Sequence, residues 1–363
     1  MKILHVVGAR PNFMKIAPVI KALVNKKGVR QILVHTGQHY DTNMSAIFFA
    51  QLGIPASDIN LGVGSGSHAV QTAQIMTRLE NVLLEENPDM VLVPGDVNST
   101  LAAALVCAKL LIPIGHVEAG LRSFDRTMPE EINRLVTDQI ADLLFTPSID
   151  GDENLIREGI APEKIHFVGN VMIDTLVRLL PEARLRWPAL CSTLKIEDHP
   201  YVLVTLHRPS NVDEPMMLAK IMETLEDISK KIHIIFSIHP RTRARIAESG
   251  LRISENRRFQ MIEPLGYMDF LSLQQRAKLV ITDSGGIQEE TTYLGVPCLT
   301  VRENTERPVT VSIGTNILVG QDMSRLRSEV DRILDGGVKR CAVPSLWDGK
   351  ASERIADIIV SRY

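Results

Sequence analysis

Short apolar runs alternate with longer amphipathic segments from one end of the chain to the other. Runs such as Ile3–Val7 and Met90–Val93 are almost continuously apolar, as expected for strands that are buried on both faces of a sheet. The segments between them, such as Met14–Asn25 and Ser99–Leu110, have helical spacing. Because strands and helices alternate, the sequence predicts an α/β protein with parallel sheets that helices cover on both faces.

The alternation is interrupted once, and this interruption predicts two domains. It stops after Gly169, and Pro181–Pro200 has arginine, leucine and proline without a strand pattern, which is typical of a connecting segment. A chain of 363 residues also suits two cores better than one. We therefore expect two doubly wound, Rossmann-like domains that face each other across a cleft. The expected strands are Ile3–Val7, Ile32–His35, Met90–Val93, Ile114–Val117, Leu143–Phe145, Ile165–Val168, Tyr201–Leu206, His233–Ile238, Phe259–Ile262, Leu279–Thr282, Cys298–Val301 and Asn316–Val319.

The overall composition excludes several classes of function. A net charge of −3 argues against sequence-independent binding of nucleic acid, which needs a basic surplus. No run has the length of a membrane span, and Met1–Val7 is too short for the apolar part of a signal peptide. The four cysteines lack C-x-x-C spacing, which indicates reduced thiols and no zinc site. We expect a cytoplasmic protein without a metal ion and without a membrane or nucleic-acid partner.

The first strand leads into Gly8–Pro11, where a ligand is expected because parallel strands bind ligands at their carboxyl ends. Gly8 permits a tight turn, and proline suits the first position of a helix. Arg10 and the helix N-terminus, with Lys15 further along, would favour a phosphate. A plain helix start with solvated basic residues is the alternative, but the position directly after strand one favours ligand binding.

Acidic residues follow the next strands of this half. Asp96 and Glu118 come at the ends of the strands Met90–Val93 and Ile114–Val117, so they form a candidate acid/base pair. Taken alone, Asp96 is more simply a turn or cap residue. Glu130 and Glu131 follow a proline, which is also an ordinary acidic helix start, and that interpretation covers at least one of them.

The second half contains a segment that suits a diphosphate. Ser284, Gly285 and Gly286 follow an apolar strand and open a helix, so consecutive backbone N–H groups are exposed at a helix N-terminus. Glu290 lies one to two turns into that helix, within reach of a ribose diol. A helix cap would need only the serine.

Two further side chains follow strands of the second half. His207 comes at the end of the strand Tyr201–Leu206, and Arg307 follows a later strand, where it suits a phosphate clamp. The glycines at 62, 64 and 66 do not have the spacing of a dinucleotide fingerprint. The first strand's turn lacks that fingerprint too, which counts against a nicotinamide cofactor.

Taken in order, these motifs resemble the non-hydrolysing UDP-N-acetylglucosamine 2-epimerases over essentially the whole chain. Each motif alone is modestly specific, but the ordered set is highly specific. The matching segments are Gly8–Pro11 with Lys15, Gly95–Asp96, His116–Arg122, Pro129–Glu131 with Asn133–Arg134, His207–Arg208, Asp283–Glu290 and Thr305–Pro308.

The resemblance implies a glycosyltransferase-B type of fold and an epimerisation at carbon 2 of UDP-GlcNAc, giving UDP-ManNAc without a cofactor. UDP leaves, a 2-acetamidoglucal stays bound, and UDP adds back after proton return to the opposite face. The implied acid/base residues are Asp96, Glu118 and Glu130, with His207 near the diphosphate or the leaving oxygen. The residues implied to hold UDP are Arg10, Lys15, Phe270 (at the uracil), Ser284, Gly285, Gly286, Glu290 and Arg307.

The resemblance also implies a chain path and an assembly. The last helix, Ala351–Arg362, would return to the first domain, so the domains comprise residues 1–170 with 350–363, and the UDP-binding residues 171–349. Domain closure around the substrate and a homodimer through helices of the first domain are expected. UDP-ManNAc supplies cell-surface polysaccharide synthesis, although the sequence does not specify the pathway.

Departures from the family pattern leave alternatives. Pro209 replaces an arginine that belongs to an allosteric UDP-GlcNAc site in many bacterial members, which predicts weak or absent activation. His35–Asp41 and Gly120–Phe124 also resemble the branch that acts on UDP-2,3-diacetamido-2,3-dideoxy-glucuronic acid. That branch tends to have tryptophan at the position of Arg307, so the arginine favours UDP-GlcNAc.

More distant alternatives share only parts of this pattern. A nucleotide-sugar glycosyltransferase would share the fold, but three acidic groups on one domain weigh against it. A hydrolysing epimerase would release free ManNAc. A dehydrogenase lacks its fingerprint here, and a non-catalytic nucleotide-sugar sensor would have no use for the carboxylates.

Overall fold

The computed structural model describes residues 1–38, 53, 56–196, 199–250 and 256–362. The chain divides into two compact units, unit 1 (Met1–Thr175 with Ser345–Tyr363) and unit 2 (Leu176–Pro344). Each unit has one parallel sheet, of seven strands in unit 1 and six in unit 2. The predicted α/β class with two parallel sheets is therefore confirmed. Residues 39–41 of one expected motif lie outside the described residues.

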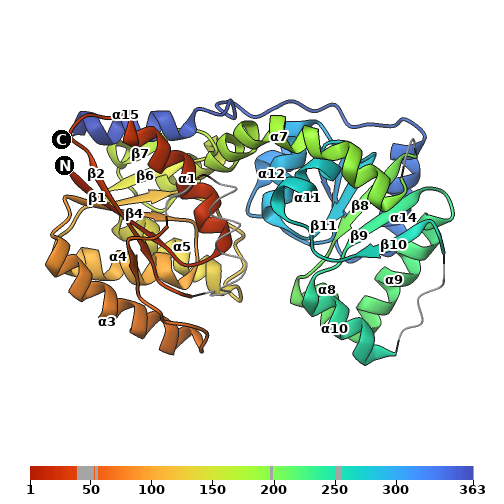
Figure 1. Cartoon of the computed structure of the whole chain (residues 1–363), viewed down its shortest axis with the longest axis horizontal. Helices are drawn as coiled ribbons and strands as arrows, with labels where there is room; N and C mark the ends of the chain where they lie inside the picture. The colour runs from red at the N-terminus through yellow and green to blue at the C-terminus, as the bar shows by residue number, and fades with distance from the viewer. Residues whose placement is uncertain (39–52, 54–55, 197–198, 251–255, 363) are drawn as a thin grey trace. The chain divides into compact units, whose positions relative to one another are not determined.

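In unit 1 the sheet has the strand order β3-β2-β1-β4-β5-β6-β7, and every pair is parallel. Helices α3 and α4 lie on one side of this sheet, and α1 and α15 pack together on the other side (Figure 1). The elements are β1 (Lys2–Val7), α1 (Arg10–Val24), β2 (Arg30–His35), β3 (Ile59–Asn60), α3 (His68–Glu86), β4 (Met90–Pro94), α4 (Asn98–Leu110), β5 (Ile114–Val117), α5 (Pro129–Ile140), β6 (Leu143–Thr146), α6 (Ile149–Arg157), the 3-10 helix η1 (Pro162–Lys164), β7 (Ile165–Phe167) and α15 (Ala351–Arg362).

Strand β4 shows why the predicted strands of this sheet have no polar alternation. All five of its residues are buried, because the strand lies in the middle of the sheet and has helices on both sides. The short edge strand β3 did not stand out in the sequence, since its two residues pair only with the end of β2.

Unit 2 repeats the architecture with the strand order β10-β9-β8-β11-β12-β13, again all parallel. Its core lies between the sheet and helices such as α9 and α14, which contact each other. The elements are β8 (Tyr201–Thr205), α8 (Pro209–Val212), α9 (Pro215–Ser229), β9 (His233–Ser237), α10 (Pro240–Ser249), β10 (Phe259–Ile262), α11 (Tyr267–Gln274), β11 (Leu279–Thr282), α12 (Gly285–Leu294), β12 (Cys298–Thr300), α13 (Pro308–Ser312), β13 (Asn316–Leu318) and α14 (Met323–Leu334).

The prediction of a connecting segment over residues 181–200 is wrong for most of its length. Helix α7 runs over Val171–Leu194 and contains both Pro181 and Pro188. Ile173, Leu176 and Ala183 are fully buried along it, so packing of one face sustains the helix where two prolines each remove a backbone hydrogen bond. The boundary between the two units falls inside this helix.

The chain returns to unit 1 through a fixed set of contacts. The indole Nε1 of Trp347 donates to the carbonyl of Pro147 at 2.8 Å. The carboxylate of Asp174 accepts the first backbone N–H groups of α15, from Ala351 at 3.1 Å and Ser352 at 2.7 Å. Both chain ends therefore lie in unit 1 (Figure 1).

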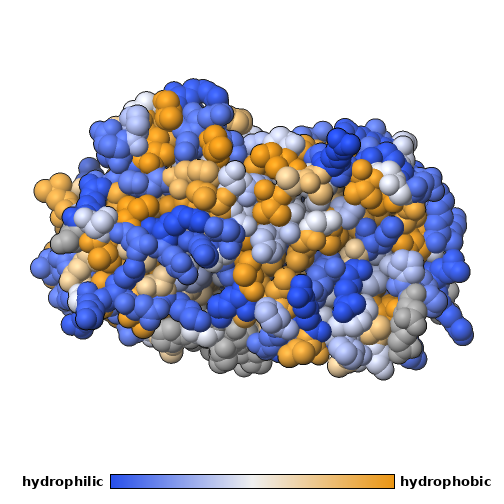
Figure 2. Space-filling view, turned by 90° about the horizontal axis from the view of Figure 1, so that it is seen from above, coloured by the Kyte–Doolittle hydropathy of each residue, from blue (hydrophilic) through white to orange (hydrophobic). Residues whose placement is uncertain are grey.

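The surface carries both hydrophilic and hydrophobic residues, as the face in Figure 2 shows. Large apolar side chains are exposed at positions such as Leu84, Leu111 and Leu185. Within the described ranges, no helix is both long and apolar enough to cross a membrane.

Candidate active site

Each sheet has a point where the strand order reverses, between β1 and β4 in unit 1 and between β8 and β11 in unit 2. In doubly wound sheets the loops at the carboxyl ends of such strands form the ligand site. Arg10 and Asp96 follow the two strands of unit 1, and His207 and Ser284 follow the two strands of unit 2. These four predicted residues therefore lie at the carboxyl edges of the two sheets, each within its own unit.

The turn after β1 is tied to the end of β4. The Asn12 side chain accepts from the backbone N–H of Ala9 at 2.9 Å and donates to the carbonyl of Pro94 at 2.7 Å. A Cβ on Gly8 would lie 2.0 Å from the Ser99 hydroxyl oxygen, so only glycine fits the turn. Arg10 opens helix α1 and is exposed.

Lys15 and Glu118 form a buried ion pair in unit 1. The ammonium of Lys15 contacts the Glu118 carboxylate, and the two side chains are only 8% and 4% exposed. Gly95 (φ +68°) makes room for this pair, because a Cβ there would lie 2.8 Å from the Lys15 nitrogen. Glu118 itself has a φ of +74°, a backbone strain that often accompanies functional residues. The sequence did not indicate this pairing, since Lys15 was expected to hold the nucleotide.

Asp96 is held by Arg134 of helix α5. The Arg134 Nη2 lies 3.0 Å from the Asp96 carboxylate, and its Nε donates to the Glu130 carbonyl at 3.1 Å. Arg134 is 3% exposed, and its Nη1 has no hydrogen-bond partner among the described residues. A buried guanidinium with an unused donor next to a carboxylate is suited to a polar ligand.

The two neighbouring glutamates at the start of α5 have different environments. Glu131 is buried, and its carboxylate accepts from the N–H and hydroxyl of Ser123 and from the N–H of Phe124, at 2.8–2.9 Å. It therefore shapes the loop after β5, which is the structural role that the sequence allowed for one of the pair. Glu130 is half-buried in the first turn of the helix, beside Arg134.

In unit 2, His207 is oriented by Asp283. The His207 Nδ1 lies 3.0 Å from the fully buried Asp283 carboxylate, which also accepts from the backbone N–H groups of His207 and Arg208 at 2.9 Å. Burial opposes the charge of Asp283, but the interactions with His207, Arg208 and Asn211 outweigh it and lower the pKa of this carboxyl. Asp283 therefore orients the His207 ring through Nδ1. Its role was missed from the sequence because the two residues are far apart in the chain.

The N-terminus of α12 has the features predicted for an anion site. Ser284 is the residue before the helix, yet its side chain makes no capping hydrogen bond. A Cβ on Gly285 would lie 2.5 Å from the Nη1 of Arg307, so the guanidinium lies against the first turn. Backbone N–H groups, the helix dipole and an arginine therefore act together at one point.

Buried ion pairs hold Arg307 in this position. Its Nε lies 2.8 Å from Glu289, and its Nη1 lies 3.4 Å from Glu306. Glu306 also binds Arg302 at 2.7 Å and lies 3.8 Å from Arg208. Three arginines face two glutamates in this cluster, so an anion at the start of α12 would meet a positive surplus.

Glu290 lies deeper on α12, next to helix α11. Its carboxyl accepts from the Tyr267 hydroxyl at 2.9 Å. Burial raises the pKa of Glu290 to about 7, although the hydrogen bond from Tyr267 opposes that shift. Phe270, on the same helix α11, is half-buried and packs against an apolar cluster of unit 2. Its expected place at the uracil remains a prediction.

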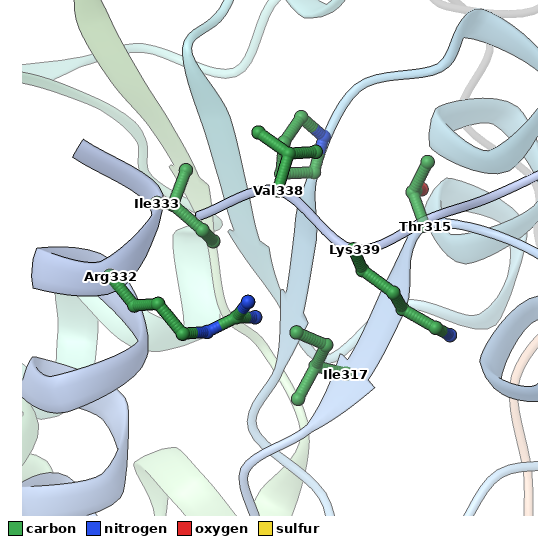
Figure 3. A pocket seen from close by; sticks show the side chains of 7 residues that line it. Thr315, Ile317, Arg332, Ile333, Val338 and Lys339 are labelled. Carbon is green, nitrogen blue, oxygen red and sulfur yellow. The ribbon is translucent and has the colours of Figure 1, made fainter. Parts of the chain in front are cut away.

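A small pocket in unit 2 lies away from these groups. It is lined by residues at the amino ends of β12 and β13 and by the end of α14, including Thr315, Ile317 and Ile333 (Figure 3). Lys339 borders it, but its ammonium donates to backbone carbonyls. Across the described part of the chain, no cluster of three or more His, Cys, Asp or Glu side chains could hold a metal ion.

Two parallel α/β units, each with polar groups where its strand order reverses, define the glycosyltransferase-B class of fold that the sequence predicted. The sequence matches the family described as UDP-N-acetylglucosamine 2-epimerase over residues 21–360. The chain belongs to this family.

Three comparisons illustrate the similarity. The UDP-N-acetylglucosamine 2-epimerase of Methanococcus maripaludis is 47% identical, over 99% of this chain and 98% of that protein. The UDP-2,3-diacetamido-2,3-dideoxy-D-glucuronate 2-epimerase of Pseudomonas aeruginosa is 43% identical, over 99% of each chain. The crystal structure of the Methanocaldococcus jannaschii UDP-GlcNAc 2-epimerase with UDP-GlcNAc and UDP is 45% identical, with a TM-score of 0.90, over 99% of this chain and all of that one.

Proposed function

We propose that this protein interconverts UDP-GlcNAc and UDP-ManNAc by epimerisation at carbon 2. The observation that carries the proposal is the full-length similarity to an epimerase whose crystal structure contains UDP-GlcNAc and UDP, at 45% identity and a TM-score of 0.90. The acidic groups at the carboxyl edge of unit 1 and the anion site of unit 2 support the same chemistry.

The UDP moiety would be held mainly by unit 2. The N–H groups of Gly285 and Gly286, the Ser284 hydroxyl and the Arg307 guanidinium suit the diphosphate, since they combine N–H donors with a fixed positive charge. Glu290 would accept from the ribose hydroxyls in place of the Tyr267 hydroxyl.

One residue of each unit would add to the binding of the UDP-sugar. Arg10 of unit 1, at the start of α1, would contribute a further positive charge. Phe270 of unit 2, on α11, would border the uracil. The domains proposed for the enzyme are residues 1–170 with 350–363, and residues 171–349.

The reaction needs proton transfer on both faces of carbon 2. A base removes the proton while the bond between carbon 1 and the UDP oxygen breaks, which leaves a 2-acetamidoglucal and UDP. Proton return to the opposite face and re-addition of UDP then give the epimer. Asp96, Glu118 and Glu130 supply these acid/base groups, because two faces require at least two positioned groups. Lys15, which contacts Glu118, would add a positive charge that helps to hold the UDP-sugar.

His207 would serve the leaving group rather than the sugar carbon. It lies in unit 2, with the residues proposed to bind the diphosphate, and Asp283 fixes its orientation through Nδ1. A ring held in this way can donate from Nε2 to the departing oxygen.

A second candidate substrate is UDP-2,3-diacetamido-2,3-dideoxy-glucuronic acid. The Pseudomonas aeruginosa enzyme named for that substrate is 43% identical over 99% of this chain. The arginine at position 307 favours UDP-GlcNAc, and the ratio of kcat/KM values for the two UDP-sugars measures the preference.

The assembly and cellular setting follow from the same proposal. We expect a cytoplasmic homodimer that supplies UDP-ManNAc for cell-surface polysaccharide. Light scattering of the purified protein would give the dimer mass, and a monomer mass at assay concentrations would contradict that part.

The deciding experiment is incubation with UDP-GlcNAc alone in heavy water, followed by proton NMR. UDP-ManNAc with deuterium at carbon 2 of both epimers is the expected result. Free ManNAc with UDP would mean hydrolysis, and no product or exchange would overturn the proposal in favour of the diacetamido-glucuronate or a transferase reaction.

A further inference from the structure

Two turns that carry candidate acid/base residues are joined beneath the surface of unit 1 by one histidine. His116 on β5 is fully buried. Its Nε2 lies 2.8 Å from the carbonyl oxygen of Gly95, the residue before Asp96, and its Nδ1 lies 2.6 Å from the carboxylate of Asp138 on α5. The neighbouring turn, with Glu118, follows directly on the same strand.

The partners of His116 determine how many protons its ring carries. The Gly95 carbonyl can only accept a hydrogen bond. Asp138 is fully buried, but its second carboxylate oxygen lies 2.7 Å from the Arg122 guanidinium and accepts from the backbone N–H of Gly120 at 3.1 Å, and both partners favour the ionised carboxylate. An ionised carboxylate also only accepts. Both ring nitrogens therefore donate, so the ring carries two N–H groups and a positive charge.

The rest of the network balances this charge. Arg122 lies 2.7 Å from Asp138 and forms two hydrogen bonds of 2.6 and 2.8 Å with Glu158. With His116 protonated, these four side chains carry two positive and two negative charges. The second oxygen of Asp138 also accepts from the backbone N–H of Gly120 at 3.1 Å, which holds the far side of the Glu118 turn.

We propose that His116 is a buried imidazolium that sets the relative position of the Asp96 and Glu118 turns. It is a positioning residue, because its buried ring contacts the Gly95 carbonyl directly and the Glu118 turn through Asp138. Glu118 has a φ of +74°, which is strained for a residue with a side chain, so its turn needs support from the surrounding structure. The proposal rests on the epimerase function for its kinetic consequence only.

The same sheet contains a matched control. His5 on β1 is also fully buried, and its Nε2 lies 2.9 Å from the amide oxygen of Gln31. Its Nδ1 has no hydrogen-bond partner in the described part of the chain. Burial lowers the pKa of the His5 ring to about 4. His5 and His116 should therefore differ in charge although both are buried on strands of one sheet.

The first test is nitrogen NMR of the wild-type protein labelled at histidine, with ring signals assigned through backbone correlations. Between about pH 6 and about pH 8, where free histidine changes charge, His116 should show two protonated ring nitrogens and His5 one. A His116 ring with a single protonated nitrogen would overturn the proposal. This result does not depend on any variant folding or on the substrate.

The second test compares His116→Gln with His5→Gln. Displaced catalytic groups cost about 100-fold in kcat, so His116→Gln should lose about that much with KM changed by less than about threefold. His5→Gln should keep wild-type kcat at a comparable loss of melting temperature. Equal kcat values in the two variants would overturn the positioning role. If His116→Gln does not fold, Glu158→Gln is tested in its place. It should lose kcat to the same extent, again with little change in KM. An inactive wild-type protein would instead contradict the proposed function.

Discussion

The two units share one topology but differ in the charges at the carboxyl edges of their sheets. In unit 1 the groups after β4 and β5 are carboxylates, Asp96 and Glu118, each held by one buried cation. In unit 2 the groups after β11 and β12 are a helix N-terminus and arginines that outnumber their glutamate partners. The same fold thus presents carboxylates in one unit and anion-attracting groups in the other, which is the division that the proposed reaction requires.

The comparison shows that the fold supplies positions while the side chains supply chemistry. Both units bury their charged residues in networks, so both sites are held in place before substrate arrives. Such preorganisation is what acid/base catalysis and diphosphate binding each require. The division of labour can be tested one unit at a time.

The largest effect should come from Glu118→Gln in unit 1. The amide keeps the shape but cannot exchange a proton, so kcat should fall by roughly 1,000-fold. UDP affinity, measured by titration calorimetry, should change little because the residues proposed to bind the diphosphate belong to unit 2. Glu80→Gln on the exposed surface of α3 is the control. A loss of UDP affinity as large as the loss of kcat would break the division between the units.

A smaller effect, on UDP binding rather than on kcat, is expected from Gly285→Ala in unit 2. The new methyl group would lie 2.5 Å from the Arg307 guanidinium and displace it without removing its charge. Loss of a charged hydrogen bond worth about 1.5–3 kcal/mol predicts a Kd for UDP raised roughly 10- to 100-fold. The rate at saturating substrate should stay near wild type. Gly66→Ala, where the methyl group meets only ordinary contacts, is the control, and an unchanged Kd would argue against the anion site.

The buried Glu290 predicts a pH dependence of nucleotide binding. Only the ionised carboxylate accepts from both ribose hydroxyls, so UDP affinity should fall as the pH drops through about 7, the pKa to which burial raises this group. Calorimetric titrations across this range should show the fall in wild type and a smaller one in Glu290→Gln. Glu248→Gln, exposed on α10, should behave like wild type. Identical profiles for wild type and Glu290→Gln would contradict the role.

The raised pKa of Glu290 also makes the stability of the folded protein depend on pH. Because its folded-state pKa of about 7 lies above the ordinary 4.5, the folded protein binds this proton more readily than the unfolded chain. The resulting stabilisation is present at acid pH and is lost as the pH rises from about 4.5 to about 7. Chemical denaturation of Glu290→Gln should lack this contribution.

The smallest effect concerns activation by UDP-GlcNAc. Pro209 opens helix α8, where a proline supplies no charge to an effector. Trace UDP-GlcNAc should therefore leave the initial rate from UDP-ManNAc unchanged. A lag that added UDP-GlcNAc abolishes would contradict this prediction.

The sequence alone determined the α/β class, the parallel strands and most of the side chains at their carboxyl ends. These features depend on local patterns, because buried strands must be apolar throughout and ligand loops must follow them. Helix α7 was mispredicted for the same reason, since local proline signals did not reveal the buried face that sustains it.

Only the tertiary structure decided which charged groups share a site. Lys15 meets Glu118, His207 meets Asp283, and His116 meets Asp138, and each pair is separated in the chain by 22 residues or more. The sequence placed several of these residues at strand ends but could not pair them, because pairing depends on which strands are neighbours and which helix faces are buried. Burial then turns each contact into a strong electrostatic interaction, which no local pattern can encode.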